Sequence, residues 1–148
     1  MRLPVWNIFF SILFAAIVLW GAQWLSVEGL LPEVVPAGDF LLMALAIFRL
    51  TRLVTYDHIT DFLRDWLKSH DETTFWGTLG KLMACPWCTG LWFAFFVPFF
   101  YMWQPLAWFV ILVLALAALA TFMQILANWV GWSAEAKKRE SQSLPLPR

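Results

Sequence analysis

The sequence predicts an all-α integral membrane protein, a bundle of four transmembrane helices with a short amphipathic helix on the cytoplasmic side. Three observations predict this fold class. The 148-residue chain is 61% hydrophobic and 14% charged, whereas soluble domains are about 45–50% apolar and about 25% charged. Four long apolar stretches divide the chain. Outside these stretches, every Lys and Arg lies in alternate connections or at the chain ends.

The four stretches set the boundaries of the predicted helices, which are residues 4–25, 40–56, 85–101 and 105–129. A helix needs about 20 apolar residues to cross a bilayer core about 30 Å thick. Trp20-Gly21-Ala22 places a bulky residue where a signal peptidase requires a small one, which favours a retained first helix over a cleaved signal peptide. Pro98 is expected to kink or shorten the third helix, and Pro105 suits the start of the fourth.

The connection between the second and third stretches contains an amphipathic helix at about residues 59–70. Its apolar side chains recur at helical spacing: Ile59, Phe62, Leu63, Trp66 and Leu67. This face either lies in the membrane plane or packs on the other helices. Residues 1–132 are predicted to form one transmembrane domain, and the polar residues 133–148 a disordered cytoplasmic tail.

Charge distribution predicts the orientation in the cytoplasmic (inner) membrane. Residues 26–39 and 102–104 contain no Lys or Arg, so they are expected outside, and both termini are expected in the cytoplasm. The formal net charge is +0, so no basic field indicates a nucleic-acid partner.

Polar residues are expected to collect in the inner half of the bundle. Arg49 and Arg52 lie inside the second stretch, Gln124 and Asn128 near the inner end of the fourth, and Asp57 just beyond the second. Charged side chains within a membrane either lock helices together or mark a binding site. A basic pocket on this side also suits anionic lipid headgroups. Both interpretations of the cluster stay open.

The two amides belong to a stripe on one face of the fourth helix. Small and polar side chains follow a 4-3-4 spacing: Ala117, Thr121, Gln124 and Asn128. Small residues allow close approach, and amides form hydrogen bonds between helices. The stripe is therefore expected to face the other helices.

Cys85 and Cys88 form a Cys-x-x-Cys motif at the start of the third helix. Three interpretations compete for this motif. The cysteines pack as small apolar residues, or they undergo thiol redox chemistry. Alternatively, they bind zinc together with His58 and His70, the two histidines of the chain, as a Cys₂His₂ set. No G-x-S-x-G, H-E-x-x-H or phosphate-loop motif is present, which favours a protein that is not an enzyme and needs no cofactor.

Two motifs carry a resemblance to a known family. The run ALAIFRLTRL at 44–53 followed by Tyr56-Asp57, and the run CPWCTGLW at 85–92, together resemble domain-of-unknown-function family 1360. The resemblance implies a short multi-pass membrane protein of a bacterium or its phage. One member is described as a sporulation protein. It also implies that Arg49, Arg52, Asp57, Cys85 and Cys88 form one recurring unit, and it implies no activity.

The predicted function is that of a non-enzymatic membrane scaffold or interaction protein. Its expected partners are membrane lipids and either another membrane protein or a second copy of the chain. Three alternatives are a metal- or thiol-based sensor at the Cys-x-x-Cys motif, a lipid-binding, substrate-binding or transport component, and a holin-like phage lysis protein.

Overall fold

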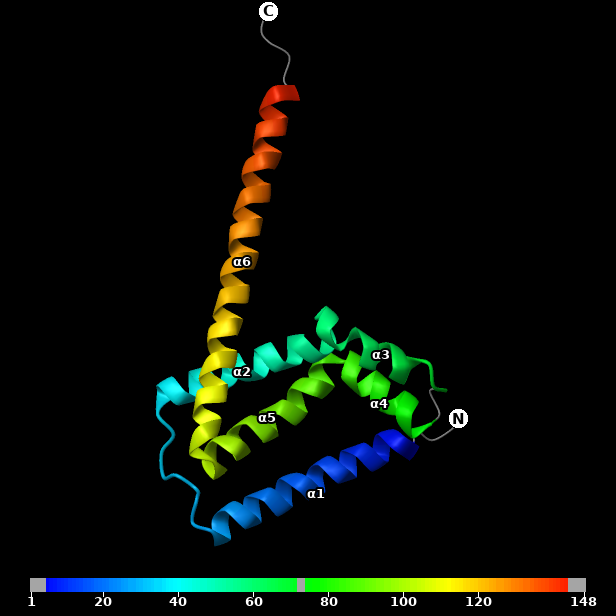
Figure 1. The fold of residues 1–148 in the computed structure, drawn as a ribbon, viewed down its shortest axis with the longest axis vertical. Coiled ribbons are helices and arrows are strands. Elements are labelled where there is room, and N and C mark those ends of the chain that lie inside the picture. The colour runs from blue at the N-terminus through cyan, green and yellow to red at the C-terminus, as the bar shows by residue number, and fades with distance from the viewer. Residues whose placement is uncertain (1–4, 72–73, 144–148) are drawn as a thin grey trace, which may run out of the picture.

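The computed structural model describes residues 5–71 and 74–143, and within these residues the fold is entirely helical (Figure 1). This confirms the all-α prediction. The elements are α1 (Val5–Val27), α2 (Ala37–Thr55), the 3₁₀ turn η1 (His58–Thr60), α3 (Asp61–Lys68), α4 (Phe75–Ala84), α5 (Pro86–Trp103) and α6 (Pro105–Ser143).

Helices α1, α2 and α5 begin and end within a few residues of the predicted stretches. Two elements differ from expectation. Helix α4 was not predicted, and α5 continues through Pro98 to Trp103 instead of ending early. Pro98 is tolerated because neighbouring helices and local adjustment accommodate a proline in an apolar helix.

The fourth predicted helix is much longer than expected, because α6 runs to Ser143. The prediction of a disordered tail is therefore wrong for residues 133–143, and residues 144–148 lie outside the described part. The sequence after Trp132 is rich in Ala, Glu, Lys and Arg, which are strong helix formers. An ion pair of 2.9 Å between Glu135 and Arg139, one helical turn apart, adds to the stability of this segment.

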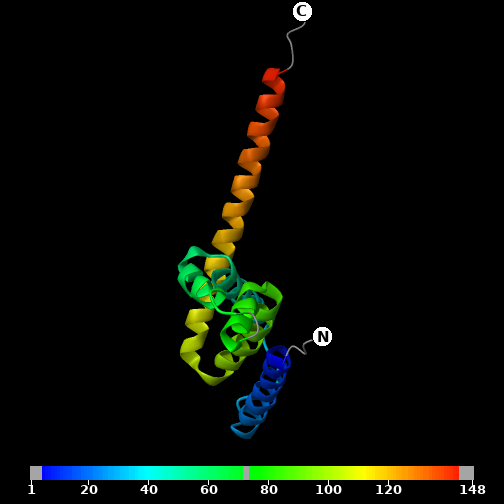
Figure 2. The same ribbon diagram turned by 90° about the vertical axis from the view of Figure 1, so that its right-hand side faces the viewer.

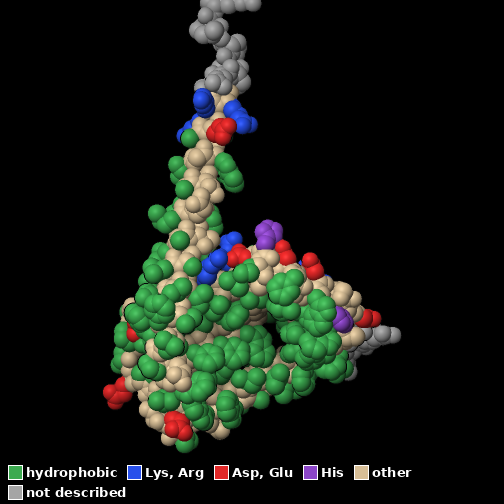
Figure 3. Space-filling model, in the orientation of Figure 1, with side chains coloured by type: hydrophobic (Ala, Val, Ile, Leu, Met, Phe, Trp, Pro, Cys, Tyr) green, Lys and Arg blue, Asp and Glu red, His purple; other side chains and the backbone are tan. Residues whose placement is uncertain are grey.

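Two described helices, α1 and α6, are long and apolar enough to cross a membrane. Helices α4 and α5 give a third span if the pair, which bends by 88° at its break, is counted as one. Hydrophobic side chains cover most of the surface visible in Figure 3, as expected for helices that face lipid rather than water. By length and composition the described helices therefore give two or three spans and not the four that were predicted. Helix α2 is the one that does not qualify, because it contains three charged residues, Asp39, Arg49 and Arg52.

The core lies where α2, α5 and α6 meet. Met43, Ala46, Val97 and Ile111 form its buried cluster. Ala115 and Ala118 are almost fully buried on the same face of α6 as Ile111, and their small side chains permit close helix contact. Beyond this crossing, α6 leaves the other helices at a steep angle and projects away from them (Figures 1 and 2).

Helix α1 lies at the edge of the assembly, against α5 (Figure 2). Aromatic pairs join the two helices along their length. The rings of Phe14 and Trp92 are 5.0 Å apart, and those of Trp24 and Trp103 are 5.6 Å apart, both edge to face. Gly21 allows this approach, since a Cβ atom there would lie 2.8 Å from the ring of Phe95.

The apolar face formed by η1 and α3 is partly buried and partly exposed. Leu67 is buried against Gly80 of α4, while Ile59 and Phe62 remain 68% and 75% exposed. Packing within the protein, one of the two expected uses, therefore applies to Leu67. For the exposed side chains, insertion into the membrane interface stays a prediction.

Candidate functional site

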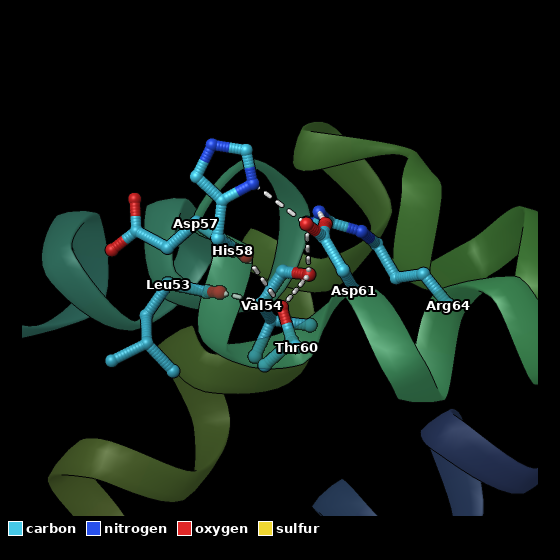
Figure 4. Close-up of polar contacts among 7 residues, drawn as sticks. All are labelled: Leu53, Val54, Asp57, His58, Thr60, Asp61 and Arg64. Atoms are coloured by element: carbon cyan, nitrogen blue, oxygen red, sulfur yellow. Dashed lines mark hydrogen bonds and ion pairs between the residues drawn. The ribbon is translucent and has the colours of Figure 1, made fainter.

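The end of α2 is closed by side chains that follow it in the sequence (Figure 4). The last carbonyl groups of a helix have no partner within that helix. The hydroxyl of Thr60 lies 2.9 Å from the carbonyl oxygen of Leu53, 3.1 Å from that of Asp57 and 3.2 Å from that of Val54. It donates its one hydrogen within this group of three acceptors. Arg64 Nη1 donates to the Val54 carbonyl at 3.1 Å. We call this arrangement, formed by Thr60 and Arg64 at the end of α2, the α2 cap.

Arg64 is buried although it belongs to the charged side of α3. Its guanidinium forms an ion pair with Asp61 while it reaches the end of α2. A positive charge at the C-terminal end of a helix also interacts favourably with the helix dipole. Arg64 therefore joins α3 to α2 through one side chain.

Asp61 has two partners beside the α2 cap (Figure 4). His58 Nδ1 lies 2.7 Å from its carboxylate, and Arg64 contacts the other oxygen. The hydrogen bond with His58, followed by that with Arg64, lowers the pKa of Asp61 below its ordinary value. The contribution of Asp61 to stability is therefore present above the pKa it has in the unfolded chain, and it is lost as the pH falls through its lowered folded pKa.

We expect the Asp61→Asn variant to lose part of the acid sensitivity of the fold, because an amide does not titrate. The measurement is the free energy of unfolding at neutral pH and below pH 3.8, the ordinary value for this group. Asp65→Asn is the matched control, since Asp65 is an exposed carboxylate on the same helix. An equal response of the two variants to acid would contradict the role given to Asp61.

Arg49 and Asp57 form an ion pair of 2.9 Å and are both partly buried. Arg49 and Asp57, two members of the predicted polar cluster, are thus brought together. Arg52 lies one turn further along α2. Its guanidinium lies 5.9 Å from the ring centre of Phe48 and 5.7 Å from that of Tyr56. Its Nε is buried without a hydrogen-bond partner among the described residues. Charged side chains gather toward this end of α2 in Figure 3.

Gln124 and Asn128 do not join this cluster. Gln124 Nε2 donates to Asn128 Oδ1 at 3.1 Å, and both side chains are exposed on the projecting part of α6. The expectation that their stripe faces the other helices is wrong. The face of α6 that packs is the neighbouring one, with Ile111, Ala115 and Ala118.

The two cysteines lie at the sharp bend between α4 and α5. Cys85 precedes the first residue of α5, and its Sγ accepts the N–H of Cys88 at 3.3 Å. The two sulfur atoms are 2.8 Å apart, and both cysteines are free thiols. Thr89 stabilises the bend, because its hydroxyl donates to the Leu82 carbonyl at the end of α4 at 2.9 Å.

The predicted zinc ligands are not brought together. His58 binds Asp61, and His70, just beyond the end of α3, has its Nδ1 2.9 Å from the carbonyl of Trp66. In residues 5–71 and 74–143, no three His, Cys, Asp or Glu side chains are grouped closely enough to hold a metal ion. The Cys₂His₂ set of Cys85, Cys88, His58 and His70 is therefore not formed.

Thr60, Arg64 and Thr89 were not identified from the sequence. Each supplies a hydrogen bond to a carbonyl six to ten residues earlier in the chain. The one available signal was the position of Thr60 just before the amphipathic helix, where Thr is a common capping residue. Its observed role is to cap the preceding helix instead.

Comparison with known proteins shows that these residues lie in a region shared with a protein family. The family model described as "Protein of unknown function (DUF1360)" matches residues 42–77 and 67–127, as the resemblance implied. The chain is 32% identical to the sporulation protein YjcA of Bacillus subtilis (strain 168) over 105 residues, which cover 60% of this chain and 89% of that protein. It is 28% identical over 97 residues to the UPF0713 protein YngL of the same organism, covering 57% and 75% of the two chains. No solved structure matches.

Proposed function

The chain belongs to the DUF1360 family, and from that premise we propose that it is a non-enzymatic interaction protein of the cytoplasmic membrane. In this proposal α1, α2, the α4–α5 pair and α6 each cross the membrane, with both termini in the cytoplasm. The placement of Lys and Arg supports this orientation. The ion pair between Arg49 and Asp57 supports the insertion of α2, because pairing lowers the cost of a charge within the membrane.

The projecting part of α6 is the main support for this proposal. Every residue from Phe122 to Arg139 is exposed, whereas the preceding turns of the helix pack on α2 and α5. Counted from Pro105, a bilayer core about 30 Å thick extends to about Gln124. In this proposal the exposed amides thus lie at the inner edge of the membrane, on a part of α6 that has no neighbour among the described residues.

The stripe on α6 suits a second helix. Gln124 and Asn128 use one donor and one acceptor in their mutual hydrogen bond, so further donors and acceptors remain for another chain. Thr121 and Gly131 continue the stripe at helical spacing, and a Cβ atom at Gly131 would meet nothing within 4 Å. Small and amide side chains at such spacing favour helix association in membranes. The partner in this proposal is α6 of a second copy.

Cysteine cross-linking in native membranes tests the interaction surface. In a Cys85→Ser/Cys88→Ser background, we expect Thr121→Cys and Gly131→Cys to form cross-linked dimers readily on oxidation. Phe122→Cys and Trp129→Cys lie on the opposite side of the helix and should form few. Adding Gln124→Leu and Asn128→Leu to the Gly131→Cys variant should reduce the dimer, because the hydrogen bonds between helices are lost.

The same variants also test the orientation. A membrane-impermeant maleimide should reach Gly131→Cys only after the cells are opened, since this end of α6 is placed in the cytoplasm. Equal cross-linking around the helix, or none at any position, would contradict the interaction surface. Labelling of Gly131→Cys in intact cells would contradict the orientation alone.

A further inference from the structure

A cavity of about 520 Å³ lies between α1, α4 and α5, beside both cysteines. This volume falls within the usual range of small-molecule sites. The wall contains aromatic and other apolar side chains, a few polar groups and the charged side chain of Lys81. Its members include Asn7, Ser11, Phe14, Cys85, Cys88 and Trp92.

The arrangement of the sulfur atoms suits a reversible disulfide. Cys85 and Cys88 are free, partly exposed to the cavity, and 2.8 Å apart at their Sγ atoms. A disulfide bond is about 2.05 Å long, so a small shift of the side chains would close it. Cys85 also accepts an N–H group at the start of α5, a position that supports thiol reactivity. Cysteines that served packing alone would not need to line an open cavity.

We propose that Cys85 and Cys88 form a redox-active dithiol that is oxidised by a membrane-soluble quinone bound in this cavity. Most of the wall is apolar, which favours an uncharged ligand, and Lys81 also lines it. The rings of Phe14 and Trp92, with centres 5.0 Å apart, offer contacts for a quinone ring of similar size. The side-chain amide of Asn7 supplies a donor for a quinone carbonyl. The chain thereby senses how oxidised the quinone of its membrane is.

The reaction balances without a further reactant. The two S–H bonds of Cys85 and Cys88 break, and one bond forms between their sulfur atoms. The two electrons and two protons that are released reduce the quinone to a hydroquinone. A membrane-soluble oxidant also removes the difficulty that the cytoplasm keeps thiols reduced, because it reaches the cavity from the lipid.

Anaerobic oxidation of the full-length protein in mild detergent tests the proposal. The protein is reduced with dithiothreitol, desalted, and mixed with decyl-ubiquinone. We expect both thiols to become unreactive toward maleimide, with one hydroquinone formed for each pair of thiols lost. Dithiothreitol should restore the thiols, and Cys85→Ser should form no hydroquinone. Mass spectrometry should show the loss of two hydrogens and no added quinone.

A cavity-filling variant separates binding from thiol reactivity. Ser11 is exposed on α1 and lines the cavity, so Ser11→Trp should fill the space without disturbing the core. We expect about a tenfold or larger loss of the quinone reaction rate in this variant. The rate should be unchanged in Ile12→Trp, which adds the same side chain at an exposed α1 residue that does not line the cavity. The small polar oxidant diamide should oxidise the wild type and both variants equally. Oxidation by diamide but not by decyl-ubiquinone, a quinone adduct, or an equal quinone rate in Ser11→Trp would each overturn the proposal. The cross-linking test above uses a chain without these cysteines and is independent of this result.

Discussion

Replacing Arg64 with leucine is expected to lower the free energy of unfolding by about 2 kcal/mol, in the range measured for hydrogen bonds to charged groups. The Arg64 side chain is only 10% exposed. Its removal leaves the Val54 carbonyl and the Asp61 carboxylate without this donor. Asp61 keeps contact with water, which limits the loss compared with a fully buried ion pair. Titration of the purified protein with SDS in mixed micelles, followed by circular dichroism, measures the change.

Two further variants of α3 make this measurement specific. Lys68→Leu also removes one positive charge from α3, but its side chain is exposed, so a change within about 0.5 kcal/mol is expected. Arg64→Lys keeps the charge but lacks the planar, forked guanidinium that reaches two partners, and should fall between the wild type and Arg64→Leu. If Lys68→Leu destabilises the protein as much as Arg64→Leu, the contact between α3 and the end of α2 is not the cause.

Replacing Gly80 with leucine is expected to lower the free energy of unfolding by about 3 kcal/mol, the upper range for overpacking. A Cβ atom at Gly80 would lie 3.0 Å from Leu67 Cβ and 3.2 Å from the Leu67 carbonyl carbon. A backbone atom of α3 cannot yield as a flexible side chain would. The gain in helix propensity over glycine, up to about 1 kcal/mol, is smaller than this clash. Unfolding in SDS again provides the measurement.

The control substitution places the same side chain in open space. Gly131→Leu adds a leucine to α6 where nothing lies within 4 Å, so it should leave stability unchanged or raise it slightly. In addition, Leu67→Ala should not restore the Gly80→Leu variant, because alanine keeps the Cβ atom and the carbonyl carbon that the new Cβ atom would meet. Equal stability of Gly80→Leu and Gly131→Leu would show that α3 and α4 do not pack closely at this point.

Much of the helical layout could be predicted because its signals are local. Apolar runs gave the extents of α1, α2 and α5, and Pro105 marked the start of α6. The end of α6 was missed because the prediction followed hydrophobicity, whereas the helix continues through Ala134 and Glu135 by propensity and ion pairing. Helix α4 was missed because residues 75–84 are too short and too mixed to stand out from a connection.

Contacts in the site could be predicted only between residues that lie close together in the sequence. Asp57 follows α2 closely enough for its pairing with Arg49 to be anticipated. Spacing shows that Gln124 and Asn128 share a face of α6, but it does not show which face packs, and the packed face is that of Ala115. Arg64 was not identified from the sequence because its burial depends on where α2 ends relative to α3, which is a tertiary feature.

The unbroken course of α6 has a geometric consequence. From Ala118, the last buried residue on this helix, to Arg139 the rise is about 30 Å at 1.5 Å per residue. A rigid helix of this kind fixes both the distance of its basic C-terminal residues from the helix core and their rotation about the helix axis. Insertion of a single residue would raise the basic end by about 1.5 Å and rotate it by about 100°. The number of residues in the projecting part of α6 therefore determines the position of its basic end, in addition to the side chains that this part carries.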